Sequence, residues 1–467
     1  MLNPSIKRIH CIGVGGIGVS ALAEVLLSRG FEVSGSDQES RSRTQRLASL
    51  GVKVYKGHAA SHVKDADLVI YTSAISAQNP ELLYAKERGV PCWSRGQLLA
   101  ELFNAKKSVA VVGSHGKTTT TSIVSHVMIE AGLDPTCMIG GVMSGYDSPF
   151  VLGKGGYFVA EGDESDRSFL LLKPHVAIVT NIDRDHLNNY NNNYDELLDA
   201  FVEFLNAIPL TGVAIVNRDD PGIEAILPRL RCSVLTFGQH VDADIRLLDY
   251  RLRGMHSTFE LTCFDRDLSC QLNLPGYHNI MNALASCVLA QFLSLEVGYL
   301  KSGLASFPGI GRRFQCRARI PFGGGEVLLV EDYGHHPRAI EVTIAAVREA
   351  WSDRRLVMVF QPHRYSRTKD CLQDFVRVLG VVDCTVLLDV YAAGESQEQG
   401  VGSGDLHEML SSESLHSIFY VDRLGNLPEF LSTIVQPDDI ILLQGAGNVG
   451  AQAAFIEDRL SLGRASC

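Results

Sequence analysis

The stretch VVGSHGKTTTTS, residues 111–122, decides the fold because it places a phosphate-loop signature directly after an apolar strand-like run. Gly116, Lys117 and Thr118 fit the end of the pattern G-x-x-x-x-G-K-[ST], whereas Val111 stands where that pattern has its leading glycine. The missing glycine shortens the loop but leaves the backbone N–H donors, the lysine and the hydroxyl in place. We therefore predict a strand, a nucleotide-phosphate loop and a helix.

Two further polar groups are predicted to share the edge of the sheet on which this loop lies. Glu161 closes the strand-like run YFVAE, residues 157–161, and His186 follows the run VAIVTNI, residues 176–182. The carboxyl ends of parallel strands meet at one edge, where ligands gather. A hydroxyl from Thr118, a carboxylate and an imidazole could there hold one or two Mg²⁺ ions.

The alternation of apolar strand, polar or glycine loop and helix repeats along all 467 residues. This rhythm is typical of α/β layers with mainly parallel sheets flanked by helices. We predict three domains, at residues 1–105, 106–311 and 312–467. The strand-like runs of the last domain are VLLVEDY, RLVMVF, CTVLLDV and DIILLQG.

Two other glycine motifs fit the pattern G-x-G-x-x-G. Residues 13–18 lie between a strand and a helix, and Asp37 follows at the end of the next strand, which is the context of a Rossmann dinucleotide site. Residues 445–450 match the same pattern, but too little chain remains to complete the βαβ unit. We interpret this second motif mainly as close helix–strand packing.

Composition limits the class of protein. The net charge of −11 argues against a sequence-wide nucleic-acid footprint. The 11 cysteines are scattered without a C-x-x-C pair, which favours a reducing cytoplasm over a disulfide framework. We expect no signal peptide, no transmembrane helix and no membrane partner, and either a monomer or a homodimer.

Taken together, the motifs resemble the Mur ligases, the ATP-dependent amino-acid ligases of bacterial cell-wall precursor synthesis. The resemblance runs nearly end to end, through GVGGIGVSALAEVL, GSHGKTTT, EGDESD, TNIDRDH, GYHNIMNAL, GRRF, DYGHHP, QPHRYSRT and GAGNVG. It implies a Rossmann-like UDP-sugar domain, a P-loop ATPase-like central domain and a Rossmann-like amino-acid domain. The motif forms favour the members that add L-alanine to UDP-N-acetylmuramate, with ATP as co-substrate and Mg²⁺, or Mn²⁺, as cofactor.

The resemblance also implies roles for single residues. Lys117, Arg313 and His335 would be catalytic, and Thr118, Glu161 and His186 would bind metal. The contacts implied for ATP are Gly113, Ser114, His115, Gly116, Lys117, Thr118, Thr119, His278, Asn279, Asn282, Arg313 and Asp332. Those implied for the UDP-sugar are Gly15, Gly16, Ile17, Gly18, Asp37, His58 and Ser73. Those implied for the amino acid are Tyr333, His335, Arg364 and Arg367.

One departure from the family pattern is informative. Several relatives complete a second metal site with a carbamylated lysine, but no lysine occurs between Lys173 and Lys301. This disfavours those relatives. The alternatives are a ligase of the same family that recycles a murein tripeptide, an NAD-dependent dehydrogenase that uses residues 13–18, and a non-catalytic UDP-sugar sensor. The dehydrogenase reading leaves the GSHGKT loop unexplained.

Overall fold

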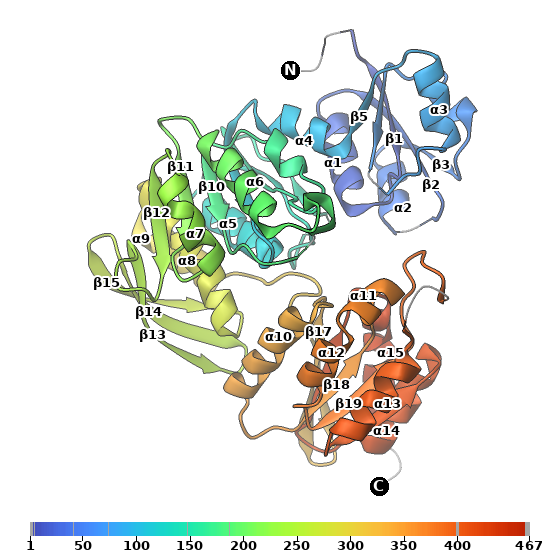
Figure 1. The fold of residues 1–467 in the computed structure, drawn as a ribbon, viewed down its shortest axis with the longest axis vertical. Coiled ribbons are helices and arrows are strands. Elements are labelled where there is room, and N and C mark those ends of the chain that lie inside the picture. Colours follow the sequence, from blue (N-terminus) through green and yellow to red (C-terminus); the bar gives the residue numbers. More distant parts are fainter. Residues whose placement is uncertain are drawn as a thin grey trace. The chain divides into compact units, whose positions relative to one another are not determined.

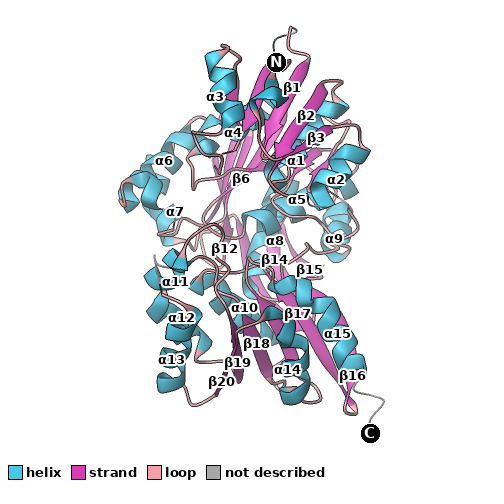
Figure 2. Ribbon diagram, turned by 90° about the vertical axis from the view of Figure 1, so that its right-hand side faces the viewer, coloured by secondary structure: helices cyan, strands magenta, loops and turns pink. Residues whose placement is uncertain are grey.

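The computed structural model describes residues 3, 5–40, 42–72, 74–146, 148–185, 187–397 and 401–462. Contacts divide the chain into two compact units: unit 1 is Met1–Tyr250, Phe259–Gln271 and Met281–Pro308, and unit 2 is Arg251–Thr258, Leu272–Ile280 and Gly309–Cys467. The described residues form three sheets flanked by helices (Figures 1 and 2). The predicted α/β class with three domains of mainly parallel sheet is confirmed.

The first sheet, in unit 1, has the strand order β3-β2-β1-β4-β5, and its neighbours are parallel. The strand order changes direction between β1 and β4, and in parallel sheets ligands bind at the carboxyl edge next to such a switch point. The strands are β1 (Arg8–Ile12), β2 (Glu32–Asp37), β3 (Lys53–Lys56), β4 (Leu68–Tyr71) and β5 (Cys92–Ser94). The helices are α1 (Ile17–Ser28), α2 (Ser42–Ser49), η1 (Ala60–Val63), α3 (Pro80–Glu87) and α4 (Arg95–Phe103).

The second sheet has the order β15-β14-β13-β12-β11-β10-β6-β9-β7-β8. Its centre is parallel, and β6 (Lys107–Val112) pairs with β10 (Val176–Val179) on one side and β9 (Tyr157–Glu161) on the other. The other strands are β7 (Thr136–Met138), β8 (Phe150–Val151), β11 (Val213–Asn217), β12 (Val234–Gly238), β13 (Ile245–Arg253), β14 (His256–Cys263) and β15 (Arg266–Leu272). The helices are α5 (Lys117–Glu130), η2 (Ser168–Leu171), η3 (Leu187–Tyr190), α6 (Tyr194–Asn206), α7 (Pro221–Ile226), η4 (Leu227–Arg229), α8 (Tyr277–Phe292) and α9 (Val297–Ala305).

The extension of this sheet by β13, β14 and β15 is absent from the sequence-based prediction. Buried and exposed residues alternate along β14 and β15, so one face of this part of the sheet packs and the other faces solvent. Such alternation is the pattern of a half-buried strand. The period-2 alternation along β14 and β15 could therefore have predicted these strands from the sequence.

The third sheet, in unit 2, has the order β16-β17-β21-β18-β19-β20. All neighbours are parallel except β16 and β17. The strands are β16 (Gln315–Phe322), β17 (Gly325–Asp332), β18 (Leu356–Phe360), β19 (Cys384–Leu388), β20 (Ser417–Val421) and β21 (Ile440–Gln444). The helices are α10 (Pro337–Ala350), α11 (Tyr365–Asp370), α12 (Leu372–Leu379), α13 (Ser403–Glu413), η6 (Leu424–Asn426), α14 (Leu427–Ile434), η7 (Val449–Gln452) and α15 (Ala453–Leu462).

The cores lie on both faces of the parallel strands. Every residue of β10, β18, β19 and β21 is buried, as expected where helices cover both faces of a sheet. Each fully buried large apolar side chain contributes about 1.5–3 kcal/mol of transfer free energy, so these strands are rigid supports for the loops at their carboxyl ends. Among the described helices, none is both long and apolar enough to cross a bilayer.

Candidate active site

The phosphate loop of unit 1 joins β6 to α5 and requires glycine at two positions. Gly113 has a φ of 130° and Gly116 a φ of 81°, conformations that L side chains rarely adopt. A Cβ on Gly113 would lie 2.3 Å from the hydroxyl oxygen of Thr180. A Cβ on Gly116 would lie 2.6 Å from Oδ1 of Asn282. The loop backbone therefore packs closely against Thr180 and Asn282.

The residues just after β10 hold this loop in shape. Asn181 Oδ1 accepts a hydrogen bond from the backbone N–H of His115 at 2.8 Å, and the Thr180 hydroxyl donates to the His115 carbonyl at 2.6 Å. The Ser114 hydroxyl accepts from the backbone N–H of Asp183 at 2.8 Å. Ser114 and His115, predicted to contact ATP, thus contact the next loop in this structure.

Lys117, the first residue of α5, is surrounded by oxygen atoms. Its ammonium donates to the Gly113 carbonyl at 2.6 Å, to the Ser114 carbonyl at 3.3 Å, and to both carboxylate oxygens of Glu164 at 2.7 and 2.8 Å. The Glu164 side chain is only 1% exposed. Burial raises the pKa of this carboxyl against the opposing effect of Lys117. The sequence motif EGDESD contains Glu164, but its pairing with Lys117 was not predicted.

Thr118 and Glu161 meet as predicted at the sheet edge. The Thr118 hydroxyl donates to Oε2 of Glu161 at 3.0 Å. Gly140 makes room for this carboxylate, since a Cβ there would lie 1.8 Å from Oε1. A hydroxyl and a carboxylate oxygen at this spacing suit the hard-cation preference of Mg²⁺, so the pair fits the implied metal. His186 lies outside the described residues. Within the described residues, no group of three or more His, Cys, Asp or Glu side chains is placed to hold a metal ion.

The residues implied for adenine lie along α8. Asn282 packs against the phosphate loop, where its Oδ1 accepts from the Thr120 hydroxyl at 3.1 Å. In unit 2, the Asn279 side chain donates to the Pro275 carbonyl at 2.7 Å, and burial lowers the pKa of His278 to about 4. Thr119 is buried in the first turn of α5.

The first glycine motif, also in unit 1, forms a tight turn between β1 and α1. Oδ2 of Asp37 accepts from the backbone N–H of Gly15 at 2.9 Å, and Gly16 donates to the Gly13 carbonyl at 3.1 Å. A Cβ on Gly18 would lie 2.8 Å from the Arg95 side chain. Ile17, at the start of α1, is partly exposed, and Ser73 lies outside the described residues. Asp37 therefore stabilises the loop itself.

In unit 2, the residues implied for the amino acid gather after β17 and β18. The ring centroid of His335 lies 5.4 Å from that of Tyr333 and 5.4 Å from that of His363. His363 stacks on Tyr391 at 5.6 Å. Arg367 Nη1 lies 3.4 Å from His363 Nδ1. The sequence reasoning did not select His363 or Tyr391, although His363 stands within the motif QPHRYSRT.

Arg364 and Arg313 complete this group of basic and aromatic side chains. Arg364 has a φ of 72°, a conformation that costs a non-glycine residue about 1–3 kcal/mol and tends to mark functional sites. The guanidinium carbon of Arg313 lies 5.1 Å from the Tyr333 ring centroid. Arginine forks next to aromatic rings suit the recognition of a carboxylate or phosphate.

Electrostatics keep both histidines of the group neutral. Burial, together with Arg367, lowers the pKa of His335 to about 3 and that of His363 to about 4. His335 Nδ1 lies 3.1 Å from the Tyr333 carbonyl, which only accepts hydrogen bonds, so Nδ1 carries the hydrogen. The Nε2 atom of His335 is then the basic nitrogen. This arrangement presents a hydrogen-bond acceptor at neutral pH.

These pKa values predict a loss of stability on acidification. Between the ordinary histidine pKa of 6.5 and the folded values of about 3 and 4, the unfolded chain binds protons that the folded chain does not. Stability from this source is thus full above pH 6.5 and falls below it, by up to roughly 1.4 kcal/mol per pH unit for each histidine. From neutral pH to pH 5, the urea midpoint of unfolding should fall less in the variant His335→Asn/His363→Asn than in the wild-type chain. An equally steep fall in that variant would contradict the assignment.

Asp332, implied for the ATP ribose, is a buried acceptor at the end of β17. Its Oδ1 accepts from the backbone N–H of Gly334 at 2.7 Å and from the Gln444 amide at 2.8 Å. Its Oδ2 accepts from the backbone N–H of Phe314 at 3.0 Å. The carboxylate therefore joins the loop after β17 and the end of β21 to the GRRF segment.

Arg312, the neighbour of Arg313, fills the second glycine motif. Its Nε donates to Oε1 of Glu331 at 2.7 Å, and its Nη2 donates to the carbonyls of Gly445 and Gly447 at 2.8 and 2.9 Å. A Cβ on Gly450 would lie 1.7 Å from Oε1 of Glu331. This motif thus serves close packing around an ion pair whose carboxylate is buried.

Removing Arg312 should destabilise unit 2. The Glu331 side chain is only 3% exposed, and in Arg312→Ala its remaining ion-pair partner is Arg317, at 3.5 Å. We expect a loss of about 3 kcal/mol in the free energy of unfolding, the lower end of the cost of breaking a buried pair. The control is Arg319→Ala, which breaks the exposed pair with Glu326 and should cost under about 1 kcal/mol. Equal losses in urea unfolding would contradict this account.

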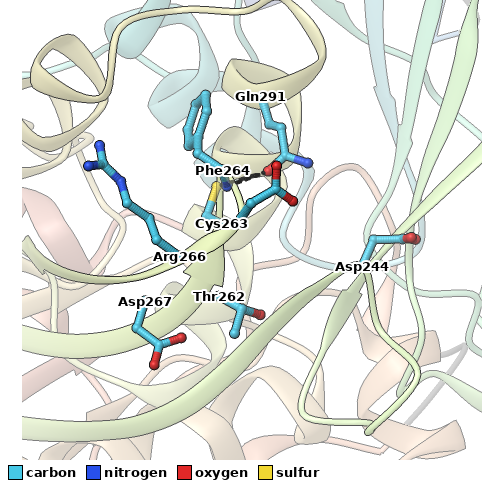
Figure 3. A pocket seen from close by; sticks show the side chains of 8 residues that line it. Asp244, Thr262, Cys263, Phe264, Arg266, Asp267 and Gln291 are labelled. Atoms are coloured by element: carbon cyan, nitrogen blue, oxygen red, sulfur yellow. Dashed lines mark hydrogen bonds between the residues drawn. The ribbon is translucent and has the colours of Figure 1, made fainter.

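A cavity of about 250 Å³ lies in unit 1, at the turn between β14 and β15 (Figure 3). Asp244, Thr262, Cys263, Phe264, Asp265, Arg266, Asp267 and Gln291 line it. None of the residues predicted to bind ATP, UDP-sugar or amino acid belongs to this lining.

Comparison with known proteins places these features in a family. Residues 8–107 match the model of the Mur ligase family catalytic domain, residues 111–290 the Mur ligase middle domain, and residues 312–447 the Mur ligase glutamate ligase domain. A UDP-N-acetylmuramate–L-alanine ligase from Coxiella burnetii (strain Dugway 5J108-111) is 45% identical over 448 residues, 96% of each chain. One from Methylococcus capsulatus is 44% identical over 456 residues, 97% of each chain.

A solved structure gives the same result at the level of the fold. The UDP-N-acetylmuramate–alanine ligase of Thermotoga maritima superposes with a TM-score of 0.84 at 29% identity, over 98% of this chain and 100% of that one. Models of the family match each of the three sheet-bearing regions, and the relatives align over nearly the whole length. The chain therefore belongs to the Mur ligase family.

Proposed function

We propose that this chain joins L-alanine to the lactyl carboxylate of UDP-N-acetylmuramate, converting ATP to ADP and phosphate and giving UDP-N-acetylmuramoyl-L-alanine. The observation that carries the proposal is the 45% identity, over 96% of both chains, to an enzyme named for this reaction. The geometry of the phosphate loop in unit 1 and the arginine–histidine group in unit 2 supports it. The family makes the chain an ATP-dependent ligase.

The first step forms an acyl phosphate. A carboxylate needs a better leaving group before an amine can displace it, and the lactyl carboxylate obtains one by attacking the γ-phosphorus of ATP, which releases ADP. Lys117 neutralises phosphate oxygens, and Arg313 stabilises charge on the transferred group. Mg²⁺, or Mn²⁺, would be held by Thr118 and Glu161 with His186 as a further ligand, and when bound it neutralises phosphate charge.

The second step forms the amide. The neutral amine of L-alanine attacks the acyl carbon, and phosphate leaves with the electron pair of the broken C–O bond. Nε2 of His335 carries the lone pair, because Nδ1 faces the Tyr333 carbonyl, so it can accept a hydrogen bond from the amine and orient it, while the proton that the amine loses leaves with the phosphate. Arg364 and Arg367 bind the alanine carboxylate, and Tyr333 lies beside His335.

The remaining sites follow the family roles. The backbone N–H groups of Ile17 and Gly18 begin α1 and have no intrahelical acceptor, which suits the diphosphate of the UDP-sugar. Ser73 and His58 belong to the same site. His278, Asn279 and Asn282 contact adenine, and Asp332 lies near the ribose.

We place the domain boundaries at residues 1–105, 106–311 and 312–467. The ranges matched by the family models, 8–107, 111–290 and 312–447, support them. A monomer or homodimer acting in the cytoplasm fits the reaction, since its substrates are water-soluble.

The decisive experiment is ADP release by the purified chain with ATP and Mg²⁺. UDP-N-acetylmuramate is supplied with L-alanine, glycine, L-serine or the tripeptide L-Ala-γ-D-Glu-diamino acid, and each component is omitted in turn. We expect ADP release to require both the UDP-sugar and L-alanine. Preference for the tripeptide would assign a recycling ligase, and no ADP with any acceptor would overturn the ligase function.

A further inference from the structure

A buried carboxylate lies behind the UDP-sugar edge of the first sheet, where no predicted role uses it. Glu81, in the first turn of α3, has a side chain with no exposed area. Its Oε2 accepts from the Ser36 hydroxyl at 2.5 Å and lies 3.0 Å from Nδ1 of His58. Its Oε1 lies 2.6 Å from Nδ1 of His62 and 3.6 Å from Nε2 of His10. Three imidazoles and a hydroxyl thus surround one carboxylate.

The surroundings of Glu81 keep it ionised. Burial opposes its charge, but the hydrogen bonds from Ser36 and His62, together with the nearby His10 ring, outweigh burial and lower the pKa to about 2. The side chain also lies at the start of a helix, where Asn79 accepts hydrogen bonds from the N–H groups of Glu81 and Leu82. A negative charge is favoured at that end of a helix. Glu81 therefore only accepts hydrogen bonds.

This fixes the position of the hydrogen on two histidines. An ionised carboxylate accepts but cannot donate, so Nδ1 of His58 and Nδ1 of His62 carry the hydrogens that face it. A neutral imidazole with hydrogen on Nδ1 has a lone pair on Nε2. The Nε2 atom of His58 is then a hydrogen-bond acceptor.

His58 and Ser36 belong to the ligand edge of the sheet. Ser36 is the penultimate residue of β2, and its carbonyl accepts from the N–H groups of Gly13 and Val14 in the first glycine motif, at 2.8 and 3.0 Å. His58 follows β3 directly after Gly57, whose N–H donates to the Asp37 carbonyl at 2.7 Å. Glu81 is thus linked through Ser36 to the glycine loop and holds His58 beside Asp37.

We infer that Glu81 is the positioning residue of the UDP-sugar site: it fixes His58 with hydrogen on Nδ1, so that Nε2 accepts a hydrogen bond from a donor on the uridine. The uridine offers two kinds of donor, the ribose hydroxyls and the uracil N3–H. His58 touches the ligand, and Glu81 acts through it. This inference rests on the proposed function, because that function supplies the UDP-sugar.

The first test needs no substitution in the carboxylate. The full-length chain is labelled with ¹⁵N-histidine, and the His58 signals are assigned by their loss in His58→Gln. The spectrum is taken near pH 8.5, where histidine side chains are ordinarily neutral. We expect a protonated Nδ1 and an unprotonated Nε2 at His58. The opposite tautomer in the wild-type chain would overturn the inference.

The second test measures binding of UDP-N-acetylmuramate by calorimetry, in the presence of β,γ-imido-ATP and without turnover. Glu81→Gln leaves one acceptor oxygen where the histidines had two, so His58 can change tautomer. Its Nε2–H would then face the hydrogen-bond donor of the uridine, and no hydrogen bond could form. We expect roughly 10- to 100-fold weaker binding, the effect of losing a hydrogen bond in a charged network. The control is Glu87→Gln, at the exposed end of the same helix, which should bind normally.

Ligand analogues identify which uridine donor is involved. UDP-N-acetylmuramate with a deoxyribose or with 3-methyluracil should bind the wild-type chain about 10-fold more weakly if it lacks the donor that His58 accepts. The same analogue should then lose no further affinity in Glu81→Gln. Equal affinity of Glu81→Gln and wild type for the complete ligand would overturn the inference.

The two proposals can fail separately. A wild-type chain that releases ADP, while Glu81→Gln binds the UDP-sugar normally, overturns the role of Glu81 alone. A chain that binds the UDP-sugar through Glu81 but releases no ADP overturns the ligase reaction alone. Binding is measured directly, so a slow catalytic step cannot produce either result.

Discussion

Replacing Lys117 with alanine should lower kcat/KM for ATP by about 100- to 1,000-fold, the effect of removing one preorganised charge from a transferring phosphate. In the structure its ammonium donates to the carbonyls of Gly113 and Ser114 and to the carboxylate of Glu164. The lysine is thus held in the loop before any phosphate arrives. Initial rates of ADP release across a range of ATP concentrations measure the loss.

The buried partner of Lys117 requires a matched control. Lys117→Ala leaves Glu164, 1% exposed, without its cation, so the variant also loses stability. Lys117→Ala/Glu164→Gln removes the stranded charge and should regain most of the urea midpoint. It should not regain ADP release. Recovery of activity in the double variant would show that the lysine acted only through folding.

Gly140→Ala should reduce ADP release about 100-fold at millimolar Mg²⁺, with partial recovery at higher Mg²⁺. A Cβ at this position would lie 1.8 Å from Oε1 of Glu161, so the carboxylate must rotate away from Thr118. The backbone itself is unstrained by alanine, since Gly140 is outside the left-handed region. Losing one oxygen ligand weakens metal binding, and the metal supplies several kcal/mol of transition-state stabilisation.

The control for this steric effect lies on the same sheet. Gly156 precedes β9, and a Cβ there would meet nothing within 4 Å. Gly156→Ala should therefore keep full activity and the same Mg²⁺ dependence, measured by titrating Mg²⁺ in the ADP assay. If both alanine variants lose activity equally, or if Mg²⁺ dependence is unchanged in Gly140→Ala, Glu161 is not a metal ligand.

Features that depend on neighbouring residues could be predicted from the sequence. The glycines and Lys117 of residues 111–122 stand beside an apolar run, and this local pattern was enough to predict strand, loop and helix. Placing Glu161 beside Thr118 needed only one further rule, that parallel strands end at a common edge. Oγ1 of Thr118 and Oε2 of Glu161 lie 3.0 Å apart in the structure.

Features that depend on packing between distant segments could not be predicted. Glu164 lies in the same acidic run as Glu161, but nothing local shows that it is buried against Lys117. Glu81 is separated by 45 residues from Ser36 and looks like an ordinary first-turn glutamate. His363 and Tyr391 meet only because a parallel bridge joins the loops that carry them. A single sequence contains no signal for such pairings.

The loop at residues 445–450 shows that one glycine spacing can serve opposite charges. Phosphate-binding turns direct their N–H groups inward, so that the partial positive ends of the peptide dipoles face an anion. Here the carbonyls of Gly445 and Gly447 point inward instead, and their partial negative ends converge on the Arg312 guanidinium. The peptide planes have turned over while the glycine spacing is unchanged. A glycine pattern therefore specifies how closely a backbone can be approached, and peptide orientation decides whether a cation or an anion approaches it.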